Sequence, residues 1–451
     1  MDKTNTKKQS VVILGAGITG LVTAYYLSSD YNVLLIEKDS SIGGTAGSFN
    51  YKDFKLDYGP HKIYTELPGI LEEIQKICPL IRVKKKNSIY LNGSYFDFPL
   101  KMSQIATKMP ATAFKAGIDI LSKPLNKRPD DSYENYLLNR FGKTLYNLSF
   151  RDYATKIWAT NPQELDAELA KRRVAISGIF QLIKSVLFKD TKQISAEYFY
   201  YPQFGMNELI KNLAKKILEN KGKIMINNEL SEINMKDDKI QYIKLAKGML
   251  RPDYLISTIP LDSLAEIIKF NGIKINSPEI HYQDLNIIYF ILNKPKALND
   301  CWIFFPEGKF IFQRVSEQKA FSEATCPKDK TAIMVETTQP LSKELINKII
   351  GQLEEAKILQ GSEIEEYFFK TIKKSYPIYK KGFSEGISQL IRRVESVDNF
   401  YTLGRQGLFN YNNMDQCWDM SMKLAEQIKQ GKSKIDWQET KKYFDSYRIV
   451  D

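Results

Sequence analysis

The stretch Ser10-Val11-Val12-Ile13-Leu14-Gly15-Ala16-Gly17-Ile18-Thr19-Gly20 joins a short apolar run to three glycines in the pattern Gly-x-Gly-x-x-Gly. The apolar, β-branched run is typical of a buried parallel strand. Gly15 suits the tight turn out of that strand, Gly17 lets the backbone approach a pyrophosphate, and Gly20 lets the following helix pack against the strand. Because the helix begins near Ile18 and Thr19, its free N–H groups and positive dipole end are expected to face the phosphates.

The next apolar run ends on a carboxylate at the distance that a dinucleotide-binding fold requires. Residues 31–36 (YNVLLI) resemble a second buried strand, and Glu37 follows, 22 residues after Gly15. About 20 residues separate the first glycine from the acid that holds a ribose hydroxyl in such folds. With a strand before the glycines and a helix after them, the pattern predicts a dinucleotide-binding unit rather than a glycine-rich turn in another α/β protein.

A glycine pair, Gly43-Gly44-Thr45, lies just beyond the acidic end of the second strand. An acidic residue, a short spacer and a glycine pair resemble the FAD-binding superfamily of amine oxidases, protoporphyrinogen oxidases, carotenoid desaturases and UDP-galactopyranose mutases. The resemblance implies FAD as the cofactor. It also implies an α/β fold in which a Rossmann-like FAD-binding domain of the GR2 type is discontinuous in the sequence and carries an inserted α+β substrate domain.

Later segments extend this resemblance over nearly the whole chain. Residues 57–61 (DYGPH) resemble the segment beside the flavin ring, and residues 201–206 (YPQFGM) resemble the return of the chain to the cofactor domain. Residues 401–405 (YTLGR) resemble a strand and turn, and residues 412–416 (NNMDQ) are expected to open the last helix. The positive end of a helix that starts near Asn413 would stabilise negative charge on a reduced flavin. An ordinary capped helix is compatible with the same residues.

The glycine pattern and the resemblance together give a set of predicted cofactor-binding residues at strand ends and turns. His61 is the histidine placed near the expected flavin, where it is a candidate for catalysis or for positioning the ring. The full set is Gly15, Gly17, Ile18, Thr19, Gly20, Glu37, Lys38, Gly43, Gly44, Thr45, Gly59, His61, Leu230, Thr258, Gly404, Arg405, Asn413, Met414 and Asp415.

The resemblance also divides the chain into a cofactor part and a substrate part. The helical part of the substrate domain is expected at 66–199 and its mixed α+β part at 266–395. An apolar stripe at 176–189 is interpreted as core packing, with a substrate lid or a membrane-dipping helix as alternatives. The FAD-binding domain is expected to consist of residues 1–65, 200–265 and 396–434, followed by a C-terminal tail at 435–451.

Within the superfamily, the chain resembles the UDP-galactopyranose mutase branch most closely. Arginines suit a diphosphate because they make bidentate, charge-assisted contacts. Two positions depart from the mutase pattern: Asn412 replaces a tyrosine that contacts the diphosphate, and Ile176 replaces a mobile-loop arginine. A core role for the tryptophan and structural ion pairs for the arginines stay open as alternatives. The substrate-binding residues that the resemblance implies are Trp158, Arg314, Tyr376, Arg405, Tyr411 and Asn412.

Three functions follow as hypotheses from the sequence. The leading one is an FAD-dependent oxidoreductase that moves a hydride from a sugar nucleotide or glycan precursor to flavin N5. The second is a non-redox mutase that uses reduced FAD as a nucleophile. The third is a flavin-binding protein without catalysis. In the first two, the protein orients the substrate and tunes the electrostatics while the flavin supplies the chemistry.

Composition restricts the partners and the cellular compartment. A net charge of +12 suits an anionic small molecule, whereas the wide spread of lysines and acids does not favour nucleic acid. With two histidines and four dispersed cysteines, a metal site is not expected. Scattered thiols fit the cytoplasm. Peripheral membrane contact is possible but not favoured, and the oligomeric state is left open.

Overall fold

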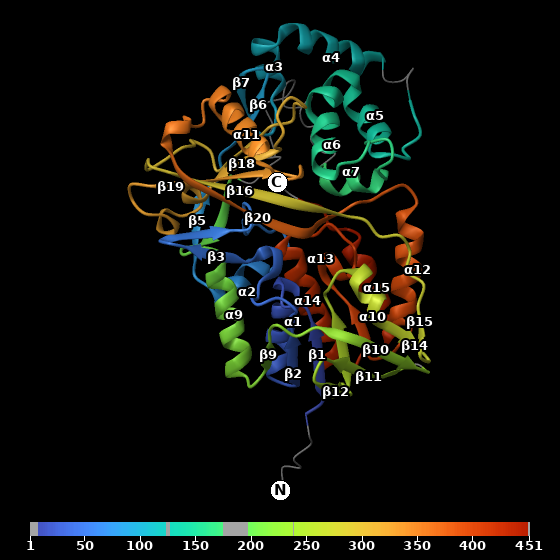
Figure 1. Cartoon of the computed structure of the whole chain (residues 1–451). Helices are drawn as coiled ribbons and strands as arrows, with labels where there is room; N and C mark the ends of the chain where they lie inside the picture. Colours follow the sequence, from blue (N-terminus) through green and yellow to red (C-terminus); the bar gives the residue numbers. More distant parts are fainter. Residues whose placement is uncertain (1–7, 123–126, 175–196, 238, 450–451) are drawn as a thin grey trace.

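A five-stranded parallel sheet, with the order β21-β13-β1-β2-β9, forms one layer of the molecule (Figure 1). The computed structural model describes residues 8–122, 127–174, 197–237 and 239–449. Because the strands come from distant stretches of the chain, the dinucleotide-binding fold is discontinuous, as the sequence predicts. In sheet order, the strands span Phe400–Thr402, Tyr254–Ser257, Ser10–Leu14, Asn32–Ile36 and Lys223–Met225.

Three helices cover one face of this sheet. Helix α1 (Ile18–Ser28) packs against both α9 (Asn207–Glu219) and α14 (Met414–Lys429). Val11 and Ile13 of β1 belong to the same hydrophobic core as these helices. Alternate strand residues therefore point into the helical layer, where burial of apolar surface stabilises the sandwich.

The other face of the parallel sheet is covered by a second five-stranded sheet with the order β12-β11-β10-β14-β15. Val12 and Leu14 of β1 share a core with Ile233 and Ile243 of this sheet. Burial on both faces explains why β1 is uniformly apolar rather than alternating. In sheet order, the strands span Gly248–Leu250, Lys239–Leu245, Leu230–Lys236, Ile268–Phe270 and Ile273–Lys274, and helices α10 (Leu261–Ile267) and α12 (Phe383–Glu395) pack nearby.

A seven-stranded sheet with the order β20-β16-β19-β18-β17-β6-β7 forms the middle of the molecule. Helix α11 (Lys343–Glu355) packs on one face through Ile346, Ile349 and Leu353. Strands β6 and β7 come from the stretch that the sequence describes as mostly helical, and they form a hairpin there. In sheet order, the strands span Ile364–Pro377, Tyr282–Leu292, Thr331–Thr337, Arg314–Glu317, Trp302–Phe304, Asn87–Leu91 and Ser94–Asp97.

A group of helices lies at the end of the molecule farthest from the parallel sheet (Figure 1). The apolar stripe predicted at 176–189 and Ile176 lie outside the described residues. Among the residues that the structure does describe, no helix has both the length and the apolar character needed to cross a bilayer. The helices of this group are α3 (Met102–Lys108), α4 (Pro110–Ser122), α5 (Tyr133–Tyr146), α6 (Asp152–Trp158) and α7 (Ala167–Arg173).

The helix that opens at residues 412–416 is α14, and the expectation that it is the last helix is wrong. Helix α15 (Lys434–Phe444) follows, capped by Ser433 and Asp436. Trp437 is fully buried and its ring packs edge-on against Tyr401, 5.8 Å away. The residues grouped as a C-terminal tail therefore add to the core beneath the parallel sheet.

Candidate functional site

The glycine-rich turn is closed on one side and open on the other. A Cβ atom on Gly20 would lie 1.9 Å from the carbonyl oxygen of Gly15, so α1 can pack this closely only without a side chain. A Cβ on Gly17 would meet nothing within 4 Å. Gly17 caps α1 in an extended conformation. The open backbone at the start of the helix is the kind of surface that binds phosphate.

The second glycine pair and Glu37 converge on the same turn. Gly43 N donates to Ala16 O at 2.7 Å, and a Cβ on Gly44 would lie 3.1 Å from the Cα of Gly17. Glu37 Oε2 accepts from Ala16 N at 2.7 Å. This cluster lies at the carboxyl ends of β1 and β2, the edge at which open α/β sheets bind dinucleotides.

Other residues predicted to bind the cofactor lie around this edge of the sheet, and they differ in how far they are buried. Thr258, just after β13, donates from its hydroxyl to Leu14 O at 2.8 Å. Leu230 is buried at the start of β10, whereas Lys38 and Thr45 are exposed. A Cβ on Gly404 would lie 2.4 Å from Thr19 Oγ1, so the turn after β21 packs against the start of α1.

Helix α14 begins beside this turn with a complete capping box. Asn413 is the N-cap, and its N–H donates to Gln416 Oε1 at 3.1 Å. Met414 is the first residue of the helix, and Asp415 is buried in its first turn. Burial raises the pKa of Asp415 to about 6. The sixteen-residue helix therefore points its positive end at the turns that carry the predicted cofactor residues.

Several buried polar atoms near these turns have no hydrogen-bond partner among the described residues. They are His61 Nδ1, Arg405 Nε, Asn412 Oδ1 and Asp415 Oδ1. Buried polar atoms in folded proteins almost always have such a partner. Together with the open backbone at Gly17, these groups fit a bound dinucleotide whose ring system reaches His61.

The partly exposed Arg314 forms an ion pair with the buried Glu336 beside the Gly59–His61 segment. Arg314 Nη2 donates to both carboxylate oxygens of Glu336, at 2.8 and 2.9 Å. A Cβ on Gly59 would lie 3.4 Å from Glu336 Oε1, so the predicted flavin segment packs directly against this pair. Glu336 was not predicted, although its position on β19 opposite Arg314 on β18 follows from the strand register.

Arg405 lies beside two of the predicted substrate residues, Tyr376 and Tyr411. Its Nη2 donates to Ser375 O at 3.1 Å, and its guanidinium lies 5.5 Å from the ring centre of Tyr376 and 4.9 Å from that of Tyr411. The Tyr411 hydroxyl accepts from Trp158 Nε1 at 2.7 Å. The backbone of Asn412 lies beside Arg405 as well. The structure thus brings the six predicted substrate residues into one cluster, which His61 joins through Arg314 and Arg405.

Arg173 joins this group although the sequence interpretation did not select it. Its guanidinium lies 5.3 Å from the ring centre of Trp158 and 5.2 Å from that of Tyr411, and it hydrogen-bonds to Tyr411. The neighbouring Arg172 instead pairs with Glu168 at 2.9 Å. The basic run Lys171-Arg172-Arg173 indicated arginines here. Which of them faces Tyr411 and which pairs with Glu168 depends on the direction in which each side chain leaves α7, and the sequence alone does not give that direction.

His61 is held neutral in this surrounding. Burial lowers the pKa of His61 to about 4, and the cations Arg314 and Arg405 contribute in the same direction. A neutral imidazole can donate or accept one hydrogen bond at each nitrogen, depending on the tautomer. His61 is therefore suited to hold a polar group of a ligand without adding charge.

The neutral state of His61 predicts a loss of stability in acid. The pKa falls from an unfolded value of about 6.5 to about 4 in the folded chain, so the unfolded chain binds the proton first as the pH falls through this window. The contribution of His61 is fully present above pH 6.5 and decreases down to pH 4, by about 3 kcal/mol at most. Urea unfolding of the wild type and His61→Gln, both in excess FAD, measures this difference. Stability curves that stay parallel from pH 7 to pH 4 would contradict it.

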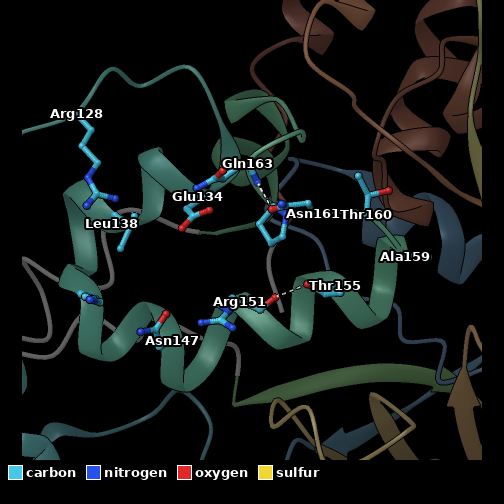
Figure 2. Close-up of a pocket in the computed structure, with 12 residues that line it drawn as sticks. Arg128, Glu134, Leu138, Asn147, Arg151, Thr155, Ala159, Thr160, Asn161 and Gln163 are labelled. Atoms are coloured by element: carbon cyan, nitrogen blue, oxygen red, sulfur yellow. Dashed lines mark hydrogen bonds between the residues drawn. The ribbon is translucent and has the colours of Figure 1, made fainter.

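A separate pocket of about 670 Å³ lies in the helical group (Figure 2). Asn147, Arg151 and Thr155 line it from successive turns of the helical stretch that ends in α6, as Figure 2 shows. Arg128 and Glu134 contribute opposite charges to its wall. None of the predicted cofactor or substrate residues lines this pocket, so it is distinct from the site around His61.

The parallel sheet, its open glycine turn and the helix end at α14 define a dinucleotide-binding protein. Together with the similarities that follow, they make it a flavoprotein whose cofactor is FAD. The sequence pattern of the UDP-galactopyranose mutase family matches residues 148–411, and that of an NAD(P)-binding Rossmann-like domain matches residues 13–73. The chain belongs to the UDP-galactopyranose mutase family.

Individual relatives include both mutases and oxidases. A probable UDP-galactopyranose mutase of Klebsiella pneumoniae is 27% identical over 36% of this chain and 44% of that protein. Human protoporphyrinogen oxidase is 21% identical over 58% of this chain and 61% of that protein. The crystal structure of a reduced UDP-galactopyranose mutase superposes with a TM-score of 0.78 at 20% identity, covering 93% of each chain, which establishes the shared fold. The chain thus spans less than two thirds of the length of these two curated relatives, and the family is one of enzymes.

Proposed function

We propose that the protein is a flavin-dependent mutase that interconverts the pyranose and furanose forms of a nucleoside-diphosphate sugar. The observation that carries this proposal is the convergence of Arg173, Arg314 and Arg405 around Tyr376, with His61 next to two of them, Arg314 and Arg405. Guanidinium groups bind diphosphates by bidentate, charge-assisted hydrogen bonds. The same positive surrounding disfavours the cationic amines that amine oxidases take, because like charges repel strongly in a partly desolvated site.

Each residue of the cluster has a role in this proposal. Arg405 and Arg173 bind the diphosphate and stabilise the charge that it gains as it leaves the anomeric carbon. Glu336 holds the Arg314 fork in a fixed orientation. Tyr376 is partly exposed and offers an aromatic face for the nucleoside or sugar. The buried rings of Tyr411 and Trp158 support it from behind, since Tyr376 stacks on Tyr411 and Tyr411 is hydrogen-bonded to Trp158.

The protein also contributes groups on the side of the site where the flavin would bind. When bound and reduced, FAD supplies a nucleophilic nitrogen for displacement of the diphosphate. The positive end of α14 stabilises negative charge near that ring. Neutral His61 offers a hydrogen bond to the sugar or the ring from the Gly59–His61 segment. We propose residues 1–65, 200–265 and 396–434 as the domain that binds the cofactor.

A second candidate is an oxidoreductase that removes a hydride from a carbon of the same kind of substrate, with FAD as the acceptor. Asn412 favours it, because the mutases carry a tyrosine at this position for the diphosphate. The longer match to protoporphyrinogen oxidase also favours it. The two candidates share the anionic substrate and differ in whether electrons leave it.

Turnover with oxidised and with dithionite-reduced protein distinguishes the two. Under anaerobic conditions with UDP-galactose and dTDP-sugars, we expect furanose product only after reduction, with no bleaching of the oxidised flavin band. Product is measured by chromatography and the flavin by its visible spectrum. Bleaching of the oxidised band by a sugar nucleotide would replace the mutase with the oxidoreductase. Absence of both signals with every sugar nucleotide would reject both candidates.

A further inference from the structure

The pocket in the helical group is framed by one continuous stretch of chain (Figure 2). Helix α5 supplies Glu134 and Leu138 to one wall, and the stretch 147–155 supplies the other. The loop 159–163 closes one end, where the N–H of Glu134 donates to Pro162 O at 3.3 Å. Because this loop is hydrogen-bonded to the helix backbone, the cavity of about 670 Å³ is part of the fold.

Two irregularities of the backbone border this pocket. Residues Asn147–Arg151 form a π-helical turn, the only one in the described part of the chain. Ala159 caps α6 with a φ of 48°, in the left-handed region that costs free energy for a residue with a Cβ atom. Both features contribute residues to the lining. Such turns and strained residues often occur at functional sites, so the pocket is a candidate binding site.

Cations outnumber acids in the lining of the pocket. Arg128, Lys143 and Arg151 are positively charged, and Glu134 is the one carboxylate among the lining residues. Arg128 and Lys143 form no ion pair with another described residue, whereas Arg151 lies 3.6 Å from the adjacent Asp152. Even with Arg151 paired, two cations face one carboxylate, so the pocket has a net positive charge.

Neutral polar groups complete the pocket. The side-chain amides of Asn147 and Gln163 have no hydrogen-bond partner among the described residues. The buried hydroxyl of Tyr146 has none either. Burial raises the pKa of Tyr146, and because Glu134 adds to this effect while Arg151 opposes it, the hydroxyl lies near both walls. The lining residues include no aromatic side chain on which a nucleobase could stack.

We propose that this pocket binds a sugar phosphate. Arg128 and Lys143 contact the phosphate by charge-assisted hydrogen bonds. The amides of Asn147 and Gln163 and the carboxylate of Glu134 bind the hydroxyl groups of the sugar, since they offer both donors and acceptors. The cavity is larger than a free phosphate requires, and its polar groups are spread over both walls. Because the pocket is separate from the site around His61, this inference does not depend on the proposed reaction.

Isothermal titration calorimetry of the FAD-loaded full chain tests the proposal. The wild type is expected to bind glucose 6-phosphate, to bind inorganic phosphate more weakly and not to bind glucose. A pocket variant, Arg128→Gln with Lys143→Gln, is expected to lose affinity for glucose 6-phosphate by about tenfold or more. The matched control, Lys348→Gln with Arg392→Gln, removes one lysine and one arginine from exposed positions on α11 and α12 and is expected to bind like the wild type.

Titration of Arg405→Met separates this pocket from the candidate substrate site, and this variant is expected to keep wild-type affinity for glucose 6-phosphate. An equal loss of affinity in Arg405→Met would place the ligand beside Tyr376 and reject the proposal. A wild type that does not bind glucose 6-phosphate overturns it, as does a pocket variant that binds like the matched control. Inorganic phosphate bound as tightly as the sugar phosphate would also reject a sugar ligand. Because Arg128 and Lys143 are exposed, flavin absorbance and the thermal midpoint are expected to match the wild type, which confirms that the pocket variant is folded.

Discussion

Gly17→Ala is expected to give a folded protein that has lost its yellow colour. The added methyl group meets no protein atom within 4 Å, and Gly17 has an extended conformation that alanine adopts readily. Stability is therefore expected to change by about 1 kcal/mol or less. The methyl group instead occupies the space through which the backbone approaches a pyrophosphate, so FAD affinity is expected to fall by about 100-fold. Equilibrium dialysis against FAD and urea unfolding without added FAD measure the two quantities separately.

The matched control is Gly20→Ala, three residues along the same turn. Here the methyl group would lie 1.9 Å from Gly15 O, a backbone atom that cannot move without separating α1 from β1. This variant is expected to lose about 3 kcal/mol or more of stability together with its cofactor. If Gly17→Ala kept FAD at wild-type affinity, the phosphates would not lie against this turn, and the assignment of the cofactor edge would fail.

Arg405→Met is expected to lower kcat/KM for a nucleoside-diphosphate sugar by roughly 100-fold or more. Arg405 is bound by backbone carbonyls of Ser375 and Asn412, and its buried Nε has no partner among the described residues. Removal of a charged hydrogen-bonding group from a desolvated contact costs about 2–5 kcal/mol. Methionine keeps most of the apolar stem, so the rings of Tyr376 and Tyr411 keep a packing partner. Steady-state kinetics with reduced protein give the ratio.

Two further variants distinguish the effect of the charge of Arg405 from the effect of its bidentate guanidinium geometry. Arg405→Lys keeps the charge but loses bidentate geometry, so an intermediate loss is expected. Arg392→Met removes an exposed arginine from α12 and is expected to leave the kinetics unchanged. A wild-type ratio for Arg405→Met would show that the diphosphate binds elsewhere.

The glycine-rich unit of the candidate site was predictable from the sequence because its residues lie close together along the chain. Gly15, Gly17, Gly20 and Glu37 fall within one strand–turn–helix–strand unit, and the physical role of each glycine depends only on local backbone geometry. The structure places this unit as the pattern predicts, with Glu37 hydrogen-bonded to the glycine turn. Local rules of this kind hold because the strand, the turn and the helix depend on neighbouring residues.

The substrate half was less predictable because its contacts join distant segments. Arg173 meets Tyr411 only because α7 and the segment before α14 pack together, and no local pattern distinguishes it from Arg172. Glu336 required the pairing of β18 with β19. The β6–β7 hairpin had a local signal, Asn92-Gly93 with positive φ at both residues, which is a strong hairpin turn that the helical interpretation overlooked.

The order of strands in the parallel sheet also determines when this sheet can be completed during synthesis. Of the five strands in this sheet, β1 is translated first, yet its neighbour β13 begins at residue 254 and the outer strand β21 begins at residue 400. One edge of β1 therefore stays unpaired while residues 15–253 are translated, and unpaired strand edges are prone to aggregate during that period. Because α14 follows β21, the cofactor edge of the sheet can be fully enclosed only after residue 429 has been translated.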